Sequence, residues 1–210
     1  MIRVVLVDDH TVVRRGIRQI LSDSDNIEVV GEASNAGEMM QILRTLACDV
    51  LLLDISMPGK NGIDALKSVK KEWPKLQVLM LSMYPEDQFA LRSLRAGAAG
   101  YLTKHSPPEK VIEAVKRLAS GKKYITPETA ESLADVLDVN QDQAPHELLS
   151  DREFQTMRFI ASGKTLSEVA EMLCISPKTV SVYRARLLEK MKLKNNSELT
   201  HYAIKAGLID

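Results

Sequence analysis

Short apolar runs alternate with amphipathic segments along the first 125 residues of the chain. The apolar runs predict strands that are buried on both faces, at 2–7, 27–33, 50–53, 78–81 and 99–102. Apolar residues at helical spacing predict the intervening helices, at 12–21, 37–46, 62–72, 85–96 and 107–119. Five β–α repeats of this kind predict an α/β doubly wound parallel sheet with helices on both faces.

The last part of the chain, from about residue 149 onward, shows only helical periodicity. The motifs SDRE at 150–153 and TLSE at 165–168 fit the capping box that begins many helices. Ser176 before Pro177 gives a third helix start, and a last helix is expected to stop near Gly207. A small all-α domain of four helices follows from this pattern.

Between the two patterns, residues 123–148 are expected to form a linker with a short helix that begins at Thr126. The polar segment NQDQAP at 140–145 is typical of a flexible connection. The predicted organisation is therefore a domain at 1–122, a linker at 123–148 and a second domain at 149–210.

Composition adds a local charge pattern to this division. The net charge is zero, but residues 126–149 carry six acids and no Lys or Arg, whereas residues 178–194 carry six bases and one acid. A short basic stretch in a neutral protein favours a local anionic partner. No stretch has the length of a secretory signal or a membrane span, so we expect a cytoplasmic protein without a membrane partner.

Three carboxylates fall where a parallel sheet places its binding site. In a five-stranded sheet of order 2-1-3-4-5, the flavodoxin-like order, ligands bind at the carboxyl ends of strands one and three. Asp8 and Asp9 follow the first strand, and Asp54 follows the third. Either of the first two could alone be a helix cap. The joint pattern favours a cation site.

Clustered carboxylates need a compensating charge, and Mg²⁺ suits oxygen ligands while keeping positions open for a phosphate. Lys104 after the fifth strand and Ser82 at the end of the fourth would add a fixed charge and a hydroxyl at the same edge. This set fits phosphoryl transfer, including attack by a carboxylate to give an aspartyl-phosphate. His10 is interpreted as structural, because three acids already suffice for the cation.

The motifs LVDDH, LLLDISMPGKNG, the serine of LMLSM, and GYLTK resemble the receiver domain of bacterial response regulators over residues 1–122. The resemblance implies that Asp54 is the phosphoacceptor and that Asp9 and Asp54 bind Mg²⁺ directly. It further implies that Asp8 acts directly or through water, that Ser56 supplies its backbone carbonyl to the metal, and that Lys104 pairs with the phosphoryl group.

By the same resemblance, Ser82 and Tyr101 are the hydroxyl and aromatic switch residues that report phosphorylation to the surface around the fourth helix. One position departs from the family pattern. Many receivers have proline directly after the lysine, whereas His105 follows Lys104 here.

The segment 165–191 has the form helix, turn, helix, in which Val180 and Leu187 are expected to hold the second helix on the core. Its outward face then combines bases for phosphates with short side chains that can approach base edges, and either a DNA contact or a solvated helix face fits it. The residues of this face are Lys178, Ser181, Val182, Arg184, Ala185 and Arg186.

This region resembles the LuxR-type DNA-binding domain through LLSDRE, ASGKTLSEVAEMLCISPKTV and EKMKLKNNSELTHYAIKAGLI. The resemblance implies that the recognition helix also brings Thr179 and Tyr183 near DNA, and that the last helix, 197–206, forms a dimer contact on DNA. A receiver domain followed by a LuxR-type DNA-binding domain is the arrangement typical of the NarL/FixJ class of two-component response regulators, which the whole chain therefore resembles.

The sequence therefore predicts a transcription regulator, not an enzyme with a separate substrate. The resemblance implies a sensor histidine kinase as phosphodonor, promoter DNA with inverted-repeat half-sites, a homodimer in the active state, and RNA polymerase as a further candidate partner. A regulator that acts without phosphorylation, or one that binds another protein, remains the alternative. A phosphatase is disfavoured because Ser56 stands where such enzymes place a second acid.

Overall fold

The computed structural model describes residues 1–57, 61–83, 86–127, 129–130 and 144–209. The chain divides into two compact units, Met1–Asp138 and Val139–Asp210. The expected helix cap at Thr126 is present, since its hydroxyl accepts a hydrogen bond from the backbone N–H of Thr129 at 3.3 Å. Most of the predicted linker lies outside the described residues. In the described part of the chain, no helix is long and apolar enough to cross a membrane.

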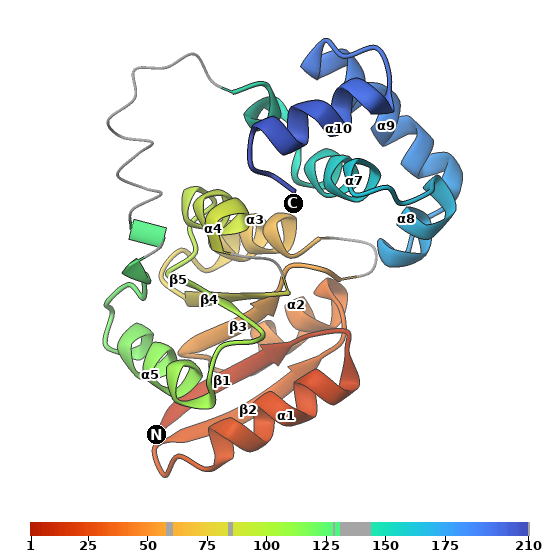
Figure 1. Cartoon of the computed structure of the whole chain (residues 1–210). Helices are drawn as coiled ribbons and strands as arrows, with labels where there is room; N and C mark the ends of the chain where they lie inside the picture. The colour runs from red at the N-terminus through yellow and green to blue at the C-terminus, as the bar shows by residue number, and fades with distance from the viewer. Residues whose placement is uncertain (58–60, 84–85, 128, 131–143, 210) are drawn as a thin grey trace. The chain divides into compact units, whose positions relative to one another are not determined.

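The first unit is built on a five-stranded parallel sheet of order β2-β1-β3-β4-β5, which confirms the predicted topology (Figure 1). Its strands lie within two residues of the positions expected from the apolar runs. They are β1 (Ile2–Val7), β2 (Ile27–Ala33), β3 (Val50–Asp54), β4 (Gln77–Ser82) and β5 (Gly100–Thr103). Every residue of β3, the central strand, is buried, as continuous apolar character requires.

Helices cover both faces of this sheet: α1 and α5 lie on one face, and α2, α3 and α4 on the other (Figure 1). Their bounds are α1 (Thr11–Ser22), α2 (Ala36–Thr45), α3 (Gly62–Glu72), α4 (Glu86–Arg95) and α5 (Pro108–Ala119). A core of Leu, Val, Ile and Ala side chains fills the space between the sheet and the α1–α5 layer, including Leu6, Leu21, Leu52, Leu81 and Val115.

The second unit is a small helical domain. It contains a short 3-10 helix, η1 (Pro145–Leu148), followed by α7 (Asp151–Ala161), α8 (Leu166–Met172), α9 (Pro177–Met191) and α10 (Asn196–Lys205). The two predicted capping boxes are present, at Ser150 for α7 and at Thr165 for α8. The hydroxyl of Ser176 caps α9 by accepting from the N–H of Thr179, as the sequence predicts.

Glycines end α7 and α10, where the chain must turn sharply. Gly163 after α7 has φ 84° and Gly207 after α10 has φ 64°, both in the left-handed region that glycine adopts without a steric penalty. The buried side chains of the domain come from all of its α-helices, for example Phe154, Val169, Val180 and Leu199.

Candidate functional site

The register of the sheet brings the predicted acids together. Val7 of β1 pairs with Leu53 of β3, so the next residues, Asp8 and Asp54, lie side by side at the carboxyl ends of their strands. Both are fully buried, whereas the side chain of Asp9 keeps 22% of its exposure. The sheet topology therefore assembles the three carboxylates at the edge where parallel sheets bind ligands.

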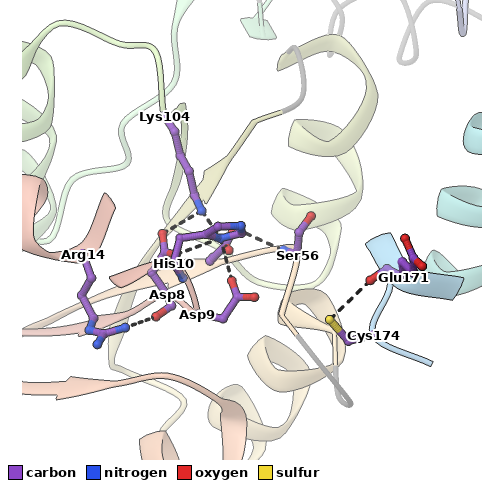
Figure 2. A network of polar contacts seen from close by, with 9 residues as sticks. Asp8, Asp9, His10, Arg14, Ser56, Lys104, Glu171 and Cys174 are labelled. Atoms are coloured by element: carbon purple, nitrogen blue, oxygen red, sulfur yellow. Dashed lines mark hydrogen bonds and ion pairs between the residues drawn. The ribbon is translucent and has the colours of Figure 1, made fainter. Parts of the chain in front are cut away.

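Lys104 closes this cluster from the end of β5. Its Nζ lies 2.7 Å from Asp8 Oδ2 and 2.9 Å from Asp54 Oδ2, and its side chain is only 3% exposed (Figure 2). The backbone N–H of Lys104 donates to the carbonyl of Ser82 at 2.7 Å. His105 in place of proline thus leaves the lysine seated in the site, because backbone pairing with β4 fixes its position.

Burial sets the proton affinity of the site. Burial raises the pKa of the Asp54 carboxyl to about 6, and repulsion from Asp8 adds to the rise while Lys104 opposes it. Burial alone would lower the pKa of Lys104, but attraction to Asp54 and a hydrogen bond to Asp8 outweigh it and raise the pKa. At neutral pH, the site therefore holds an ionised Asp54 against an ionised Lys104.

The structure adds His10 to this cluster, which the sequence interpretation left out as structural. His10 Nδ1 lies 2.9 Å from Asp9 Oδ1 and 3.5 Å from Asp8 Oδ1 (Figure 2). Ligand atoms of Asp8, Asp9, His10 and Asp54 all lie within 4.8 Å of one another. The carboxylates of Asp8, Asp9 and Asp54 and the ammonium of Lys104 together give a net charge of −2, which one divalent cation neutralises.

Sequence reasoning also missed Arg14, which lies in the first turns of α1. Its Nη1 donates to the backbone carbonyl of Asp8 at 2.6 Å (Figure 2). Its Nε donates to Glu32 Oε2 at 3.1 Å. The side chain is 16% exposed, so it holds the chain behind Asp8 against the end of β2. The sequence did contain a signal for this contact, because Arg14 lies four residues after His10 on a predicted helix and Glu32 lies near the end of the neighbouring predicted strand.

Two described residues after β3, Ser56 and Gly62, lie close to Asp54. The backbone N–H of Ser56 donates to Asp54 Oδ1 at 3.2 Å, while the predicted role of the Ser56 carbonyl stays a prediction. The side chain of Asn61 caps α3 by accepting from the N–H of Ile63 at 2.6 Å. Gly62 then packs so closely on β3 that an added Cβ would overlap the carbonyl oxygen of Asp54 and lie 2.7 Å from Ile55 Cα. Pro58 and Gly59 of the family motif lie outside the described residues.

The two predicted switch residues lie on neighbouring strands. Ser82 ends β4 and is fully buried, one position beyond Leu81, which pairs with Asp54. Tyr101 lies on β5 opposite Met80 and is 2% exposed. The structure thus places Ser82 at the same edge as the carboxylates and Tyr101 inside the fold.

The second candidate surface lies on α9. Val180 and Leu187 are buried as predicted, and this fixes which face of the helix points outward. The predicted DNA-facing residues lie on the remaining surface. Lys178, Ser181, Val182, Ala185 and Arg186 are exposed, and Thr179, Tyr183 and Arg184 are half-buried.

Two of the half-buried residues have local partners. Arg184 Nε donates to Asn196 Oδ1 at 2.7 Å, which ties α9 to the first turn of α10. The hydroxyl of Thr179 lies 2.8 Å from that of Ser176 at the N-cap. The hydrogen bond to Asn196 restricts the orientation of the Arg184 guanidinium.

Comparisons with known proteins match both halves of the chain. The model of the response regulator receiver domain matches residues 4–116, and that of the bacterial regulatory proteins of the luxR family matches residues 147–203. Response regulator UvrY of Escherichia coli K12 is 41% identical over 209 residues, covering 99% of this chain and 96% of that protein. Response regulator GacA of Pseudomonas aeruginosa is 36% identical over 211 residues, covering 100% and 99%.

Solved structures of similar length share the fold. RcsB of Salmonella enterica serovar Typhimurium, bound to promoter rprA in the presence of the phosphomimetic BeF3⁻, aligns with a TM-score of 0.65 and 27% identity over 96% of this chain and 98% of that chain. A structure of two RcsB dimers bound to two parallel DNAs aligns with a TM-score of 0.60 and 28% identity over 96% of each chain.

Proposed function

Because the chain belongs to the NarL/FixJ class of two-component response regulators, we propose that phosphorylation of Asp54 by a sensor histidine kinase controls its binding to promoter DNA. The observation that carries the proposal is the buried contact of Lys104 with Asp8 and Asp54 at 2.7 and 2.9 Å. A lysine and two acids at the end of a parallel sheet suit a phosphoryl group, which needs a nucleophile and charge neutralisation.

In the proposed step, an oxygen of the Asp54 carboxylate attacks the phosphorus of a phosphohistidine on the kinase. A P–O bond forms, the P–N bond breaks, and its electron pair remains on the imidazole nitrogen of the donor. Lys104 balances the charge of the transferred group, and the N–H of Ser56 holds Asp54 Oδ1 at 3.2 Å. Ionised Asp54 is the form that reacts, so burial that raises its pKa to about 6 leaves it competent at neutral pH.

The donor set fits a hard divalent cation. We propose that Asp9 and Asp54 hold Mg²⁺ directly, with the carbonyl of Ser56, while Asp8 acts directly or through water. Bound Mg²⁺ would neutralise charge on the phosphoryl oxygens. The chain's own residues position the acceptor and supply the remaining positive charge.

Signal transmission is proposed to run through Ser82 and Tyr101. The hydroxyl of Ser82 would bond the phosphoryl group, and its strand is already joined to Lys104 by a backbone hydrogen bond of 2.7 Å. Movement at the end of β4 would then open space beside Tyr101, which is buried on the neighbouring strand. The result is a changed surface around α4 and β5.

On the output side, we propose that two α9 helices of a homodimer read inverted-repeat half-sites, with α10 as the contact between the protomers. The exposed bases and short side chains of α9 support this reading, and RcsB, a relative of the same fold, has been solved as dimers on DNA. RNA polymerase is a further proposed partner, and the cytoplasm is the proposed compartment because promoter DNA is the ligand. Relatives are regulators rather than enzymes with a separate substrate, and self-dephosphorylation is the only turnover proposed.

The decisive experiment uses radiolabelled acetyl phosphate with MgCl₂ on the full chain and on the variants Asp54→Asn and Asp64→Asn. The wild type and Asp64→Asn, whose carboxylate is 46% exposed on α3, should take up one phosphoryl group, and Asp54→Asn should take up none. Phosphorylation should also raise affinity for DNA selected from a random pool at least tenfold. Equal DNA affinity of the wild type and Asp54→Asn under these conditions would instead favour the regulator that acts without phosphorylation.

A further inference from the structure

His10 stands beside the carboxylates, yet neither the family chemistry nor the charge balance of the site uses it. It is the N-cap residue of α1, and its side chain makes no capping hydrogen bond. Its backbone N–H donates to Asp8 Oδ1 at 2.8 Å, and this bond holds the chain so that the imidazole points back over the acids (Figure 2). The position of the ring therefore comes from the backbone and not from a packing contact, since the side chain is 59% exposed.

The imidazole nitrogen and the Asp9 carboxylate face the same point. Asp9 Oδ1 is buried and makes no hydrogen bond in the structure, although His10 Nδ1 is only 2.9 Å away. The two atoms form an ion pair when the imidazole carries a proton on Nδ1, and a metal ion could take the place of that proton as the partner of both groups. Since ligand atoms of His10, Asp8, Asp9 and Asp54 lie within 4.8 Å of one another, that partner is one that accepts both oxygen and nitrogen donors.

We propose that His10 is an additional metal ligand that makes this site bind borderline transition-metal ions, such as Co²⁺ and Ni²⁺, more tightly than an all-oxygen site would. Imidazole adds affinity for these ions, whereas Mg²⁺ prefers oxygen ligands and gains little from a nitrogen. A transition-metal ion held this way competes with Mg²⁺ for the same carboxylates. The inference rests on the proposed cation site and adds to it a nitrogen donor that sets metal preference.

Calorimetric titration of the full chain with CoCl₂ and with MgCl₂ at pH 8 tests the proposal, because neutral imidazole is the form that binds metal. We expect His10→Ala to lower Co²⁺ affinity at least tenfold and Mg²⁺ affinity less than twofold. His105→Ala is the matched control, since His105 is exposed on the loop after Lys104 and is not among the clustered ligands. It should leave both affinities unchanged.

A second variant and a second readout protect the test against a folding defect. His10→Asn replaces the imidazole nitrogen by an amide oxygen donor, so it should bind Mg²⁺ as the wild type does and still lose the Co²⁺ preference. In proton NMR of the Co²⁺-loaded protein, a strongly shifted imidazole N–H resonance should appear in the wild type and in His105→Ala and be absent from both His10 variants.

Equal Co²⁺ affinity in the wild type and in both His10 variants, with normal Mg²⁺ binding, would overturn the role of His10 and leave the proposed function intact. Failure of the wild type to bind either ion would overturn both, because the carboxylates would then lack a cation. A Co²⁺ preference that persists in His10→Asn but not in His10→Ala would show that an oxygen donor suffices, which also contradicts the proposal.

Discussion

Glu153 shows at the scale of one residue how the second domain uses a buried carboxylate. Its Oε2 accepts from the backbone N–H of Ser150 at 2.8 Å, which completes the capping box of α7, and from Lys190 Nζ of α9 at 2.6 Å. Burial alone would raise the pKa of Glu153, but the hydrogen bonds from Lys190 and Ser150 outweigh the effect of burial. The pKa of Glu153 therefore lies below its ordinary value. One side chain thus caps a helix and joins two helices.

The lowered pKa predicts a stability that depends on pH. The stabilisation is fully present above the pKa of an unfolded Glu, about 4.5, and is lost as pH falls through the lower folded value. Lys190→Met should therefore lower the free energy of unfolding by about 1 kcal/mol at pH 7 and by less near pH 3. Urea unfolding across this range measures the difference.

Lys194→Met is the matched control, because Lys194 is exposed on the loop before α10 and the structure gives its side chain no ion pair among the described residues. Its effect on the free energy of unfolding should be small and the same at both pH values. A Lys190→Met penalty that does not change with pH would mean that Glu153 does not carry the interaction.

Single residues also show where sequence reasoning stops. Asp8, Asp54 and Lys104 could be predicted because strand ends are visible as apolar runs and a parallel sheet brings those ends together. The contacts of His10 and Arg14 were missed, since the direction of their side chains depends on how α1 begins after β1. The pattern of apolar and polar residues predicts which helix or strand carries a residue. It does not predict the direction in which that residue's side chain points.

At the scale of elements, the contact between α3 and β3 depends on one missing Cβ. Gly62 begins α3 directly beside the carbonyl of Asp54, so the helix can start only if its first residue has no side chain. The neighbouring Asn61 caps the same helix end. The start of α3 and the position of Asp54 are therefore a single structural feature.

Gly62→Ala should destabilise the protein by about 3 kcal/mol or more, because the new methyl group meets backbone atoms that cannot move aside independently. Gly16→Ala is the opposite case, since Gly16 lies exposed in α1 with nothing within 4 Å of an added Cβ. It should stabilise the protein by about 0.5–1 kcal/mol through helix propensity. Denaturant midpoints compare the two, and a neutral Gly62→Ala would contradict the packing argument.

The elements themselves followed closely from the sequence. The strands, the helices and the capping boxes at Ser150 and Thr165 are confirmed, because periodicity and cap chemistry are local properties. The role of Gly62 did not follow, because a glycine in the motif KNG predicts a turn equally well. Only the distance between α3 and β3 distinguishes a turn glycine from one required by close packing.

At the scale of the whole molecule, the chain joins an acidic cluster in one domain to an exposed basic helix in the other. Net charge conceals this division, since the chain carries 28 basic and 28 acidic residues. The separation of charge matters because DNA affinity depends on local phosphate contacts and not on the protein's total charge.

Replacing Lys178, Arg184 and Arg186 together by Ala should weaken DNA binding and reduce its salt dependence. Each lost phosphate contact lowers the slope of log K against log salt by about 0.9, so the reduction should approach about 3 per protomer. Fluorescence anisotropy of labelled DNA at several salt concentrations measures the slope. The control variant replaces three exposed bases of the first unit by Ala, namely Arg15, Lys116 and Lys122, and so changes the protein charge by the same amount. An equally large fall of the slope in this control would contradict the assignment of the α9 bases to phosphate contacts.

The ammonium of Lys104 is the internal counter-ion of the resting protein. It bridges the ends of β1 and β3 from β5, at 2.7 Å from Asp8 and 2.9 Å from Asp54. A phosphoryl group on Asp54 would remove that carboxylate's charge and offer the ammonium a more negative neighbour, so the bridge must be redistributed whenever the group arrives. Under the proposed mechanism, phosphorylation of Asp54 would therefore weaken the same Lys104 contacts that join the ends of β1 and β3 in the unmodified protein, and these strand ends would loosen in the same step.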